Sequence, residues 1–254
     1  MEKVDPDLLL HLLPAVDQES YTSHTQPSNW DQHKFYWIFK NMDFETWHHT
    51  NGSEVLWLAG PAECHISGAS SCIVDLVKEK PSQTQHVVLY FFCSTAPAKV
   101  SFATTFVSTI IHQLACRLPL LKEKITTVFL RTLLDTIFND QPPSDPGRSH
   151  FKTVDSAEAT VKNILKAAIS GYWSALKAVM KIVQGLSLII DGLDEVEHRK
   201  VEFIRELYVF IKQLGGRPYT TRVLLTSRPE AEIKEILGLL PSIEYDRERK
   251  GLIS

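Results

Sequence analysis

Residues 60–67, with the sequence GPAECHIS, carry half of the residues that a phosphate-binding loop needs. Such a loop follows the pattern GxxxxGKS or GxxxxGKT between a strand and a helix. Its glycines let backbone N–H groups converge on phosphate oxygens, its lysine neutralises the outer phosphates, and its hydroxyl binds magnesium. Gly60 fills the first glycine position and Ser67 the hydroxyl position, whereas His65 replaces the second glycine and Ile66 replaces the lysine. We therefore expect a degenerate nucleotide-binding site at these four residues.

The missing lysine decides how much affinity such a loop keeps. A cation about 4 Å from a phosphate oxygen is worth roughly 4 kcal/mol at an effective dielectric constant near 20. Each loss of about 1.4 kcal/mol lowers affinity tenfold, so a few orders of magnitude are at stake. Glu63 adds repulsion if its side chain points inward. A protonated His65 offsets part of the loss, but a side chain at a glycine position is expected to force the loop away from its phosphate-wrapping shape.

Three acidic residues follow a second apolar run, LSLIIDGLDE at 186–195. Open α/β sheets bind their ligands beyond the carboxyl ends of the strands, and this run predicts a strand that ends at Asp191. Asp191 and Ser67 are therefore the expected metal ligands, for magnesium. Asp194 and Glu195 are the expected catalytic acids, which would polarise an attacking water. Acids in this place also occur as ordinary helix N-caps, so a purely structural role stays open.

Arg228 follows a third apolar run, in the sequence RVLLTSRPE at 222–230. A guanidinium at the tip of a strand is suited either to contact a terminal phosphate or to pair with a carboxylate. Asp191 and Asp194 are the two expected partners. Arg228 therefore joins Gly60 and Ser67 among the predicted cofactor-binding residues.

Apolar runs alternate along the chain with stretches of helical periodicity, which is typical of a parallel sheet covered by helices. We predict an α/β protein with the P-loop NTPase fold, a five-stranded parallel sheet with helices on both faces. The strand that carries the acids should lie beside the strand that precedes the loop, because right-handed crossovers leave few alternatives. The expected strands are 54–59, 86–93, 186–191, 222–227 and 242–245, and the expected helices lie within 102–114, 119–138, 155–184, 204–214 and 230–240.

Bulk properties exclude several classes of partner. The 254-residue chain has a formal net charge of −3, so it has no excess of Lys and Arg to neutralise a nucleic acid or an anionic membrane. Its four cysteines form no CxxC pair, which favours free thiols in a reducing compartment. The apolar stretch near the N-terminus is too short for a secretory signal or a membrane span. We therefore expect a cytoplasmic protein whose partners are proteins.

These motifs together resemble the NACHT family of STAND-class NTPases, especially the nephrocystin-like modules of filamentous fungi. The resemblance begins at FYWIFKNMDFETWHHTNGSEVLWLAG, residues 35–60, with Trp37, Phe44 and Trp47 in the aromatic positions. It continues through GPAECHIS, LIIDGLDE and LLTSRPE and spans roughly residues 35–245. Family members carry both glycines and the lysine, so this sequence departs from them at its Walker A loop.

The resemblance also implies a domain organisation. We expect an N-terminal lead and linker at 1–34, a NACHT-like P-loop NTPase domain at 35–247 and a C-terminal tail at 248–254. Such modules, like those of NLR proteins, normally stand between an effector domain and C-terminal helical or repeat regions, and they act as switches for self-assembly. The chain is therefore expected to be a truncated form or a fragment of a longer protein.

Three functions are consistent with these residues. The first is a regulatory or signalling module that binds ATP or GTP weakly or not at all and acts through protein contacts and self-association, hence a pseudo-NTPase and not an enzyme. The second is a working Mg²⁺-dependent ATPase or GTPase in which Lys181, Arg228 or a histidine replaces the loop lysine. The third is a structural scaffold that binds no ligand.

Overall fold

The computed structural model describes residue 7 and residues 13–20, 35–79, 86–95, 101–139 and 168–245. The chain divides into two compact units, which are considered separately below. One comprises Met1–Ala15 and Ala103–Ile182, and the other comprises Val16–Phe102 and Val183–Ser254. The predicted tail at 248–254 and the first half of the predicted helix at 155–184 lie outside the described residues.

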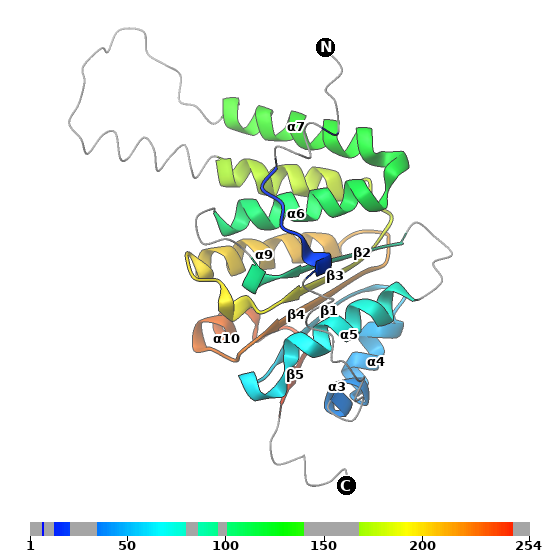
Figure 1. The fold of residues 1–254 in the computed structure, drawn as a ribbon, viewed down its shortest axis with the longest axis vertical. Helices are drawn as coiled ribbons and strands as arrows, with labels where there is room; N and C mark the ends of the chain where they lie inside the picture. The colour runs from blue at the N-terminus through cyan, green and yellow to red at the C-terminus, as the bar shows by residue number, and fades with distance from the viewer. Residues whose placement is uncertain are drawn as a thin grey trace, which may run out of the picture. The chain divides into compact units, whose positions relative to one another are not determined.

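The second unit is built on a five-stranded sheet in which all strands are parallel (Figure 1). Each predicted strand is confirmed to within one residue at either end. This α/β architecture is the predicted fold class and is consistent with a P-loop NTPase. The strands are β1 (Ser53–Ala59), β2 (His86–Phe92), β3 (Gly185–Asp191), β4 (Thr221–Ser227) and β5 (Ser242–Glu244), and their order across the sheet is β2-β3-β4-β1-β5.

The prediction that the strand with the acids, β3, lies beside the strand before the loop, β1, is wrong. β4 lies between them and pairs with β1 on one side and with β3 on the other. All seven residues of β4 are buried, which suits a central strand, while the short β5 lies at an edge. Local patterns identify a strand but not its neighbours, so the sequence could not exclude this insertion. As a result, the end of β4, where Arg228 follows, lies at the centre of the carboxyl edge.

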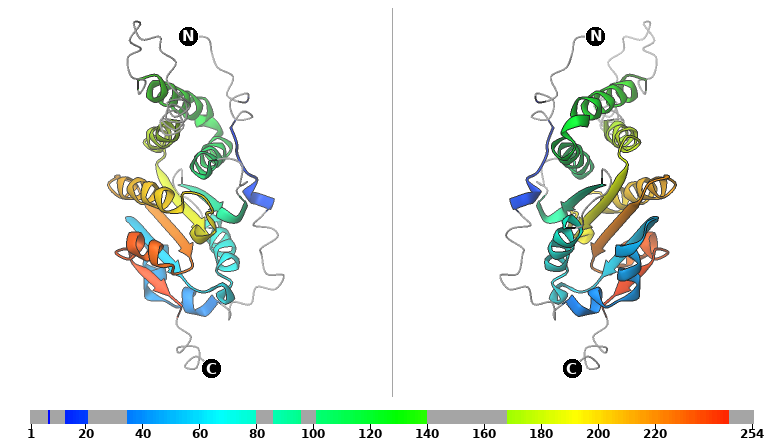
Figure 2. Two further views of the ribbon diagram at one scale, coloured as in Figure 1. Left: turned by 90° about the vertical axis from the view of Figure 1, so that its left-hand side faces the viewer. Right: turned by 90° about the vertical axis from the view of Figure 1, so that its right-hand side faces the viewer.

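Helices cover both faces of this sheet, as predicted (Figure 2). On one face, α3 (Tyr36–Phe39), α4 (Met42–His49) and α5 (Ile66–Lys78) bury their apolar side chains against alternate residues of the strands, such as Leu56 and Leu58. On the other face, α9 (Lys200–Gly215) contacts β1 and β4, and α10 (Ala231–Leu237) contacts α9. Side chains alternate between faces along a strand, so the four long strands, β1 to β4, present side chains to both faces of the sheet.

Two buried tryptophans tie the neighbourhood of β1 to the central strand. The indole N–H of Trp47, in the aromatic lead-in, donates to the carbonyl oxygen of Val223 at 3.0 Å. The indole N–H of Trp57 donates to the hydroxyl of Ser227, also at 3.0 Å. Both rings bury a large apolar area while their polar atoms stay paired, which is the usual requirement for a buried tryptophan. These contacts fix β4 against β1 near the predicted site.

The first unit is mainly helical over its described residues between 103 and 182. α6 (Phe102–Arg117) and α7 (Lys122–Asn139) are joined by a 3-10 turn, η4 (Pro119–Leu121), and a further helix occupies 168–180. Phe106 of α6 packs against Trp173, with ring centroids 5.6 Å apart, and Phe129 of α7 contacts Tyr172 at 5.7 Å. The predicted helix within 102–114 is therefore confirmed as most of α6. Among the described helices, none is long and apolar enough to cross a membrane.

The N-terminal lead is not merely a linker. Residues 16–20 belong to the sheet unit, and Gln18 is 3 % exposed. Its side-chain oxygen accepts a hydrogen bond from the backbone N–H of Phe92 at 2.7 Å. Because β2 is an edge strand, this amide has no neighbouring strand on its outer side. Gln18 therefore completes the end of β2 from a distant part of the chain.

We predict that Gln18→Ala lowers the free energy of unfolding by about 1–3 kcal/mol, because it leaves the buried N–H of Phe92 without this acceptor. Urea denaturation of the two proteins would measure the change. Glu19→Ala is the matched control: Glu19 is exposed and its carboxylate lies 3.7 Å from the ammonium of Lys78, a surface pair worth 1 kcal/mol or less, by an order-of-magnitude estimate. Equal stability of Gln18→Ala and wild type would show that the hydrogen bond contributes nothing.

Candidate functional site

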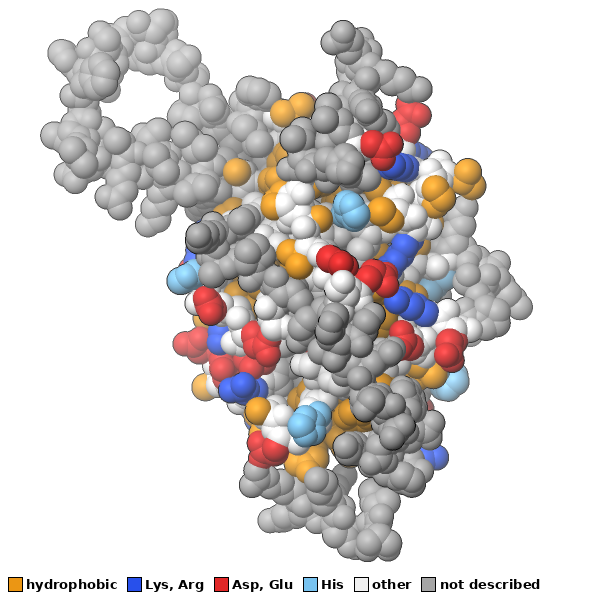
Figure 3. All heavy atoms as spheres, viewed as in Figure 1, with side chains coloured by type: hydrophobic (Ala, Val, Ile, Leu, Met, Phe, Trp, Pro, Cys, Tyr) orange, Lys and Arg blue, Asp and Glu red, His pale blue; other side chains and the backbone are white. Residues whose placement is uncertain are grey.

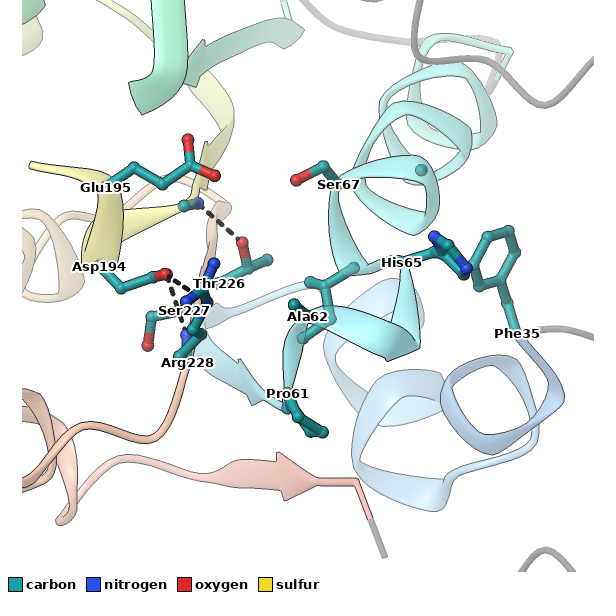
Figure 4. A pocket seen from close by; sticks show the side chains of 14 residues that line it. Phe35, Pro61, Ala62, His65, Ser67, Asp194, Glu195, Thr226, Ser227 and Arg228 are labelled. Atoms are coloured by element: carbon teal, nitrogen blue, oxygen red, sulfur yellow. Dashed lines mark hydrogen bonds and ion pairs between the residues drawn. The ribbon is translucent and has the colours of Figure 1, made fainter. Parts of the chain in front are cut away.

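A cleft of about 410 Å³ lies at the carboxyl edge of the sheet, within the second unit. Its walls are the loop after β1, the start of α5, the turn after β3 and the end of β4 (Figure 4). Its volume is within the range of small-molecule sites. Seven of the eight predicted site residues line it: Gly60, His65, Ile66, Ser67, Asp194, Glu195 and Arg228. The eighth, Asp191, is buried at the end of β3.

Two backbone amides of the loop after β1 donate hydrogen bonds to carbonyl oxygens of the same loop. It forms a 3-10 turn, η2 (Ala62–Cys64), in which the N–H of Cys64 donates to the carbonyl oxygen of Pro61 at 3.0 Å and the N–H of His65 donates to that of Ala62 at 3.2 Å. These two amides are engaged within the turn and do not point to a ligand. The first amides of α5, at residues 66–68, have no acceptor within the helix and lie at the cleft. Anion attraction in this wall therefore comes from the start of α5.

His65 adopts the left-handed backbone conformation, with φ 51° and ψ 42°. We expected a side chain here to force the loop into another shape, yet the backbone at this residue keeps the region that glycine favours. A residue with a Cβ pays roughly 1–2 kcal/mol for this conformation. The imidazole is exposed and lies next to the ring of Phe35 at one end of the cleft (Figure 4).

Packing alone accounts for the first glycine of the motif. A Cβ on Gly60 would lie 3.0 Å from Cδ1 of Ile66 and 3.2 Å from Cβ of Tyr245. Ile66, at the lysine position, therefore places a methyl group against the loop instead of a charge in the cleft. Glu63 is exposed and is not among the residues that line the cleft, so its charge is not directed at a ligand there.

Asp191 is 2 % exposed and joins three elements by hydrogen bonds. Its Oδ1 accepts from the hydroxyl of Ser70 in α5 at 2.6 Å and from the hydroxyl of Thr226 in β4 at 2.7 Å. Burial raises the pKa of this carboxyl above its ordinary value, and the hydroxyls of Ser70, Thr226 and Ser67 oppose that shift. Sequence reasoning missed Ser70 and Thr226, although Ser70 stands three residues after Ser67 and thus on the same side of the helix.

Asp194 is the partner of Arg228, one of the two that the sequence allowed. Its Oδ1 accepts from the backbone N–H of Arg228 at 2.9 Å, and its Oδ2 lies 3.2 Å from Nε of the guanidinium. The Asp194 side chain is 8 % exposed and that of Arg228 is 57 % exposed. Both carboxylate oxygens of this predicted catalytic acid are therefore engaged with Arg228.

Glu195 reaches the cleft because the chain turns at Gly192. Gly192 has φ 76°, a left-handed conformation that favours glycine, and a Cβ there would lie 3.2 Å from the Glu195 carboxylate. Partial burial raises the pKa of Glu195, and the charges of Asp191 and Asp194 raise it further. Its carboxylate lies across the cleft from the hydroxyl of Ser67 (Figure 4). A raised pKa suits a group that exchanges protons.

Positive charge is scarce in the cleft. Among its described lining residues, Arg228 is the one permanent cation, and His65 is the one titratable base. Lys181, a predicted substitute for the lysine, is not among the lining residues. The arrangement thus combines two acids, three hydroxyls and a helix start with a single paired arginine.

Comparison with known proteins identifies a family match over part of the chain. Residues 33–129 match the family described as Nephrocystin 3, N-terminal. This region runs from the aromatic lead-in through β1, the loop, α5 and β2 to α7, and it is less than half of the chain. Neither a curated protein nor a solved structure matches the chain significantly.

We predict that Asp191→Asn raises the melting temperature at pH 7. The asparagine keeps an oxygen acceptor for Ser70 and Thr226 and removes a buried charge. Because the folded pKa of Asp191 is raised, its contribution to stability is present below the unfolded pKa of about 3.8 and is lost as pH rises through the folded value. The gain of the variant should therefore shrink as pH falls toward 4. Thermal melts between pH 4 and 8 would measure it, and a gain independent of pH would contradict this account.

Substitutions at His65 should reverse the usual order of alanine and glycine. At most positions glycine is less stable than alanine by about 0.5–1 kcal/mol. At φ 51° alanine keeps the strain that glycine relieves, so His65→Gly should exceed His65→Ala in stability by about 1 kcal/mol. Urea denaturation would measure both. If alanine were the more stable variant, residue 65 would not be left-handed in solution.

Proposed function

We propose that this chain is a NACHT-like regulatory or signalling module whose nucleotide site binds ATP or GTP weakly or not at all. One observation carries the proposal: Arg228, the one permanent cation among the described residues of the cleft, is already paired with Asp194. A triphosphate carries several negative charges and would meet Asp194 and Glu195 in the same cleft. The start of α5 attracts anions but supplies only about half a charge.

The loop supports the same conclusion. In a phosphate-binding loop the backbone amides converge on the ligand. Here the amides of Cys64 and His65 are used inside η2, and Ile66 covers Gly60 with a methyl group. Compared with a standard phosphate-binding loop, this loop therefore has neither the positive charge nor all of the backbone amides that would bind phosphate.

A working Mg²⁺-dependent ATPase or GTPase is the alternative, and the oxygen ligands favour it. Ser67 and Asp191 would supply the hydroxyl and carboxylate oxygens that Mg²⁺ prefers, and Mg²⁺ would neutralise phosphate charge when bound. Glu195, with its raised pKa, would take the proton of an attacking water. Arg228 or His65 would then have to replace the missing lysine.

A regulatory role follows from weak binding. A ligand shifts an equilibrium between two conformations only through its different affinities for them, so a module that binds nucleotide weakly is governed by its protein contacts. We propose protein partners, including self-association, in the cytoplasm, as in fungal-type and NLR-like modules. On the described part of the face in Figure 3, Lys and Arg lie among Asp and Glu, which favours proteins over nucleic acid or membrane as partners.

Calorimetric titration with Mg·ATP and Mg·GTP would test the proposal. Wild-type protein should show no more than millimolar binding. The double variant His65→Gly, Ile66→Lys restores the glycine and a charge worth roughly 4 kcal/mol, so its affinity for Mg·ATP should rise by about two orders of magnitude or more. The control His65→Gly, Ile66→Met keeps a long side chain without charge and should bind no better than wild type.

Tight binding by the wild-type protein would refute this proposal. Turnover of ATP that Glu195→Gln abolishes would establish the alternative, because that variant removes the base and keeps the shape of the side chain.

A further inference from the structure

The pair of Asp194 and Arg228 has two unequal halves. Asp194 is nearly buried and is held by the backbone N–H of Arg228, which donates to Oδ1 at 2.9 Å whatever the guanidinium does. The guanidinium contacts Oδ2 through Nε at 3.2 Å and is more than half exposed. The carboxylate is therefore held by the backbone as well as by the guanidinium, and the guanidinium is the more accessible half of the pair.

The guanidinium also lines the cleft, on the same side as Glu195 and opposite the start of α5 (Figure 4). An anion bound at the start of α5 would therefore face this guanidinium across the cleft. Arginine forms its strongest contacts with carboxylates and phosphates, and both use the same planar set of donors. Asp194 therefore already binds the guanidinium that a phosphate would need.

Local charge favours the internal pairing. The charge of Asp194 raises the pKa of Asp191 and of Glu195, so these three carboxyl groups lie close enough to act on one another. Each added negative charge near the pair makes it costlier to leave Asp194 without its cation. A ligand thus competes with a fixed carboxylate whose surroundings hold Arg228 in place.

We propose that Asp194 is a positioning residue that acts as an internal competitor: it holds Arg228 in the ligand-free protein, and the phosphate of a nucleotide binds by taking the guanidinium from it. This inference rests on the proposed function and names a second cause of weak binding, besides the missing lysine. The ligand class is a nucleoside di- or triphosphate with its magnesium ion.

Asp194→Asn is the decisive variant. Asparagine keeps an oxygen for the backbone N–H of Arg228 and removes the charge that holds the guanidinium. The affinity for Mg·ATP should rise about tenfold over wild type, and Arg228→Ala in the Asp194→Asn background should abolish that gain. Glu63→Gln is the matched control, because Glu63 is exposed on the loop and does not line the cleft, so the variant removes one negative charge without altering the pair, and it should give less than a threefold change. Calorimetry or ligand-detected NMR would measure all four proteins.

Each outcome has one meaning. Weak binding by wild type with no gain in Asp194→Asn overturns this inference and leaves the proposed function standing. Tight binding by wild type overturns the proposed function, while the ratio of the two affinities still tests the competition. An equal gain in Glu63→Gln overturns the inference, since general charge repulsion would then explain the result.

Thermal melts would verify that Asp194→Asn is folded. Asp194→Ser, which also removes the charge and keeps a small polar side chain, serves if it is not. If neither variant folded, Asp194 would be a requirement of the fold and the inference would be wrong.

Discussion

The buried carboxylate of Asp191 holds together the elements that form the cleft. It ends β3, accepts hydrogen bonds from α5 and β4, and thereby joins three segments that are far apart in the chain. Thr226 extends the connection, because its hydroxyl also accepts from the N–H of Gly192 at 3.0 Å. The turn that carries Asp194 and Glu195 begins at Gly192, so its position depends on this set of bonds. A buried acid is a costly way to connect elements, and such costs are typical of functional sites.

The two acids that line the cleft, Asp194 and Glu195, have different surroundings. Asp194 is paired and nearly buried, whereas Glu195 is exposed and its pKa is raised. Two adjacent acids in one turn thus have different surroundings and different chemistry. This difference decides what each could do for a ligand: one controls an arginine and the other is available to exchange a proton.

Sequence reasoning was accurate where the determining forces are local. The five strands were predicted to within a residue because runs of apolar residues between turns are typical of buried strands. The carboxyl edge was located correctly because parallel strands end on the same side. Reasoning was less successful at Gln18, which a polar N-terminal segment led us to treat as linker. Its hydrogen bond to Phe92 joins two segments that are far apart in the chain, and no local sequence pattern predicts such a contact.

The sequence by itself therefore determined the strands, the helical periodicity, the apolar side chain at Ile66 and the presence of three acids near one edge. Only the tertiary structure decided that β4 separates β1 from β3, that Arg228 pairs with Asp194 and not Asp191, and that Ser70 and Thr226 bind the buried carboxylate. The physical reason is the range of the interactions. Apolar periodicity and residue chemistry act within a few positions of the chain, whereas strand order and charge pairing depend on which distant segments come into contact when the cores pack.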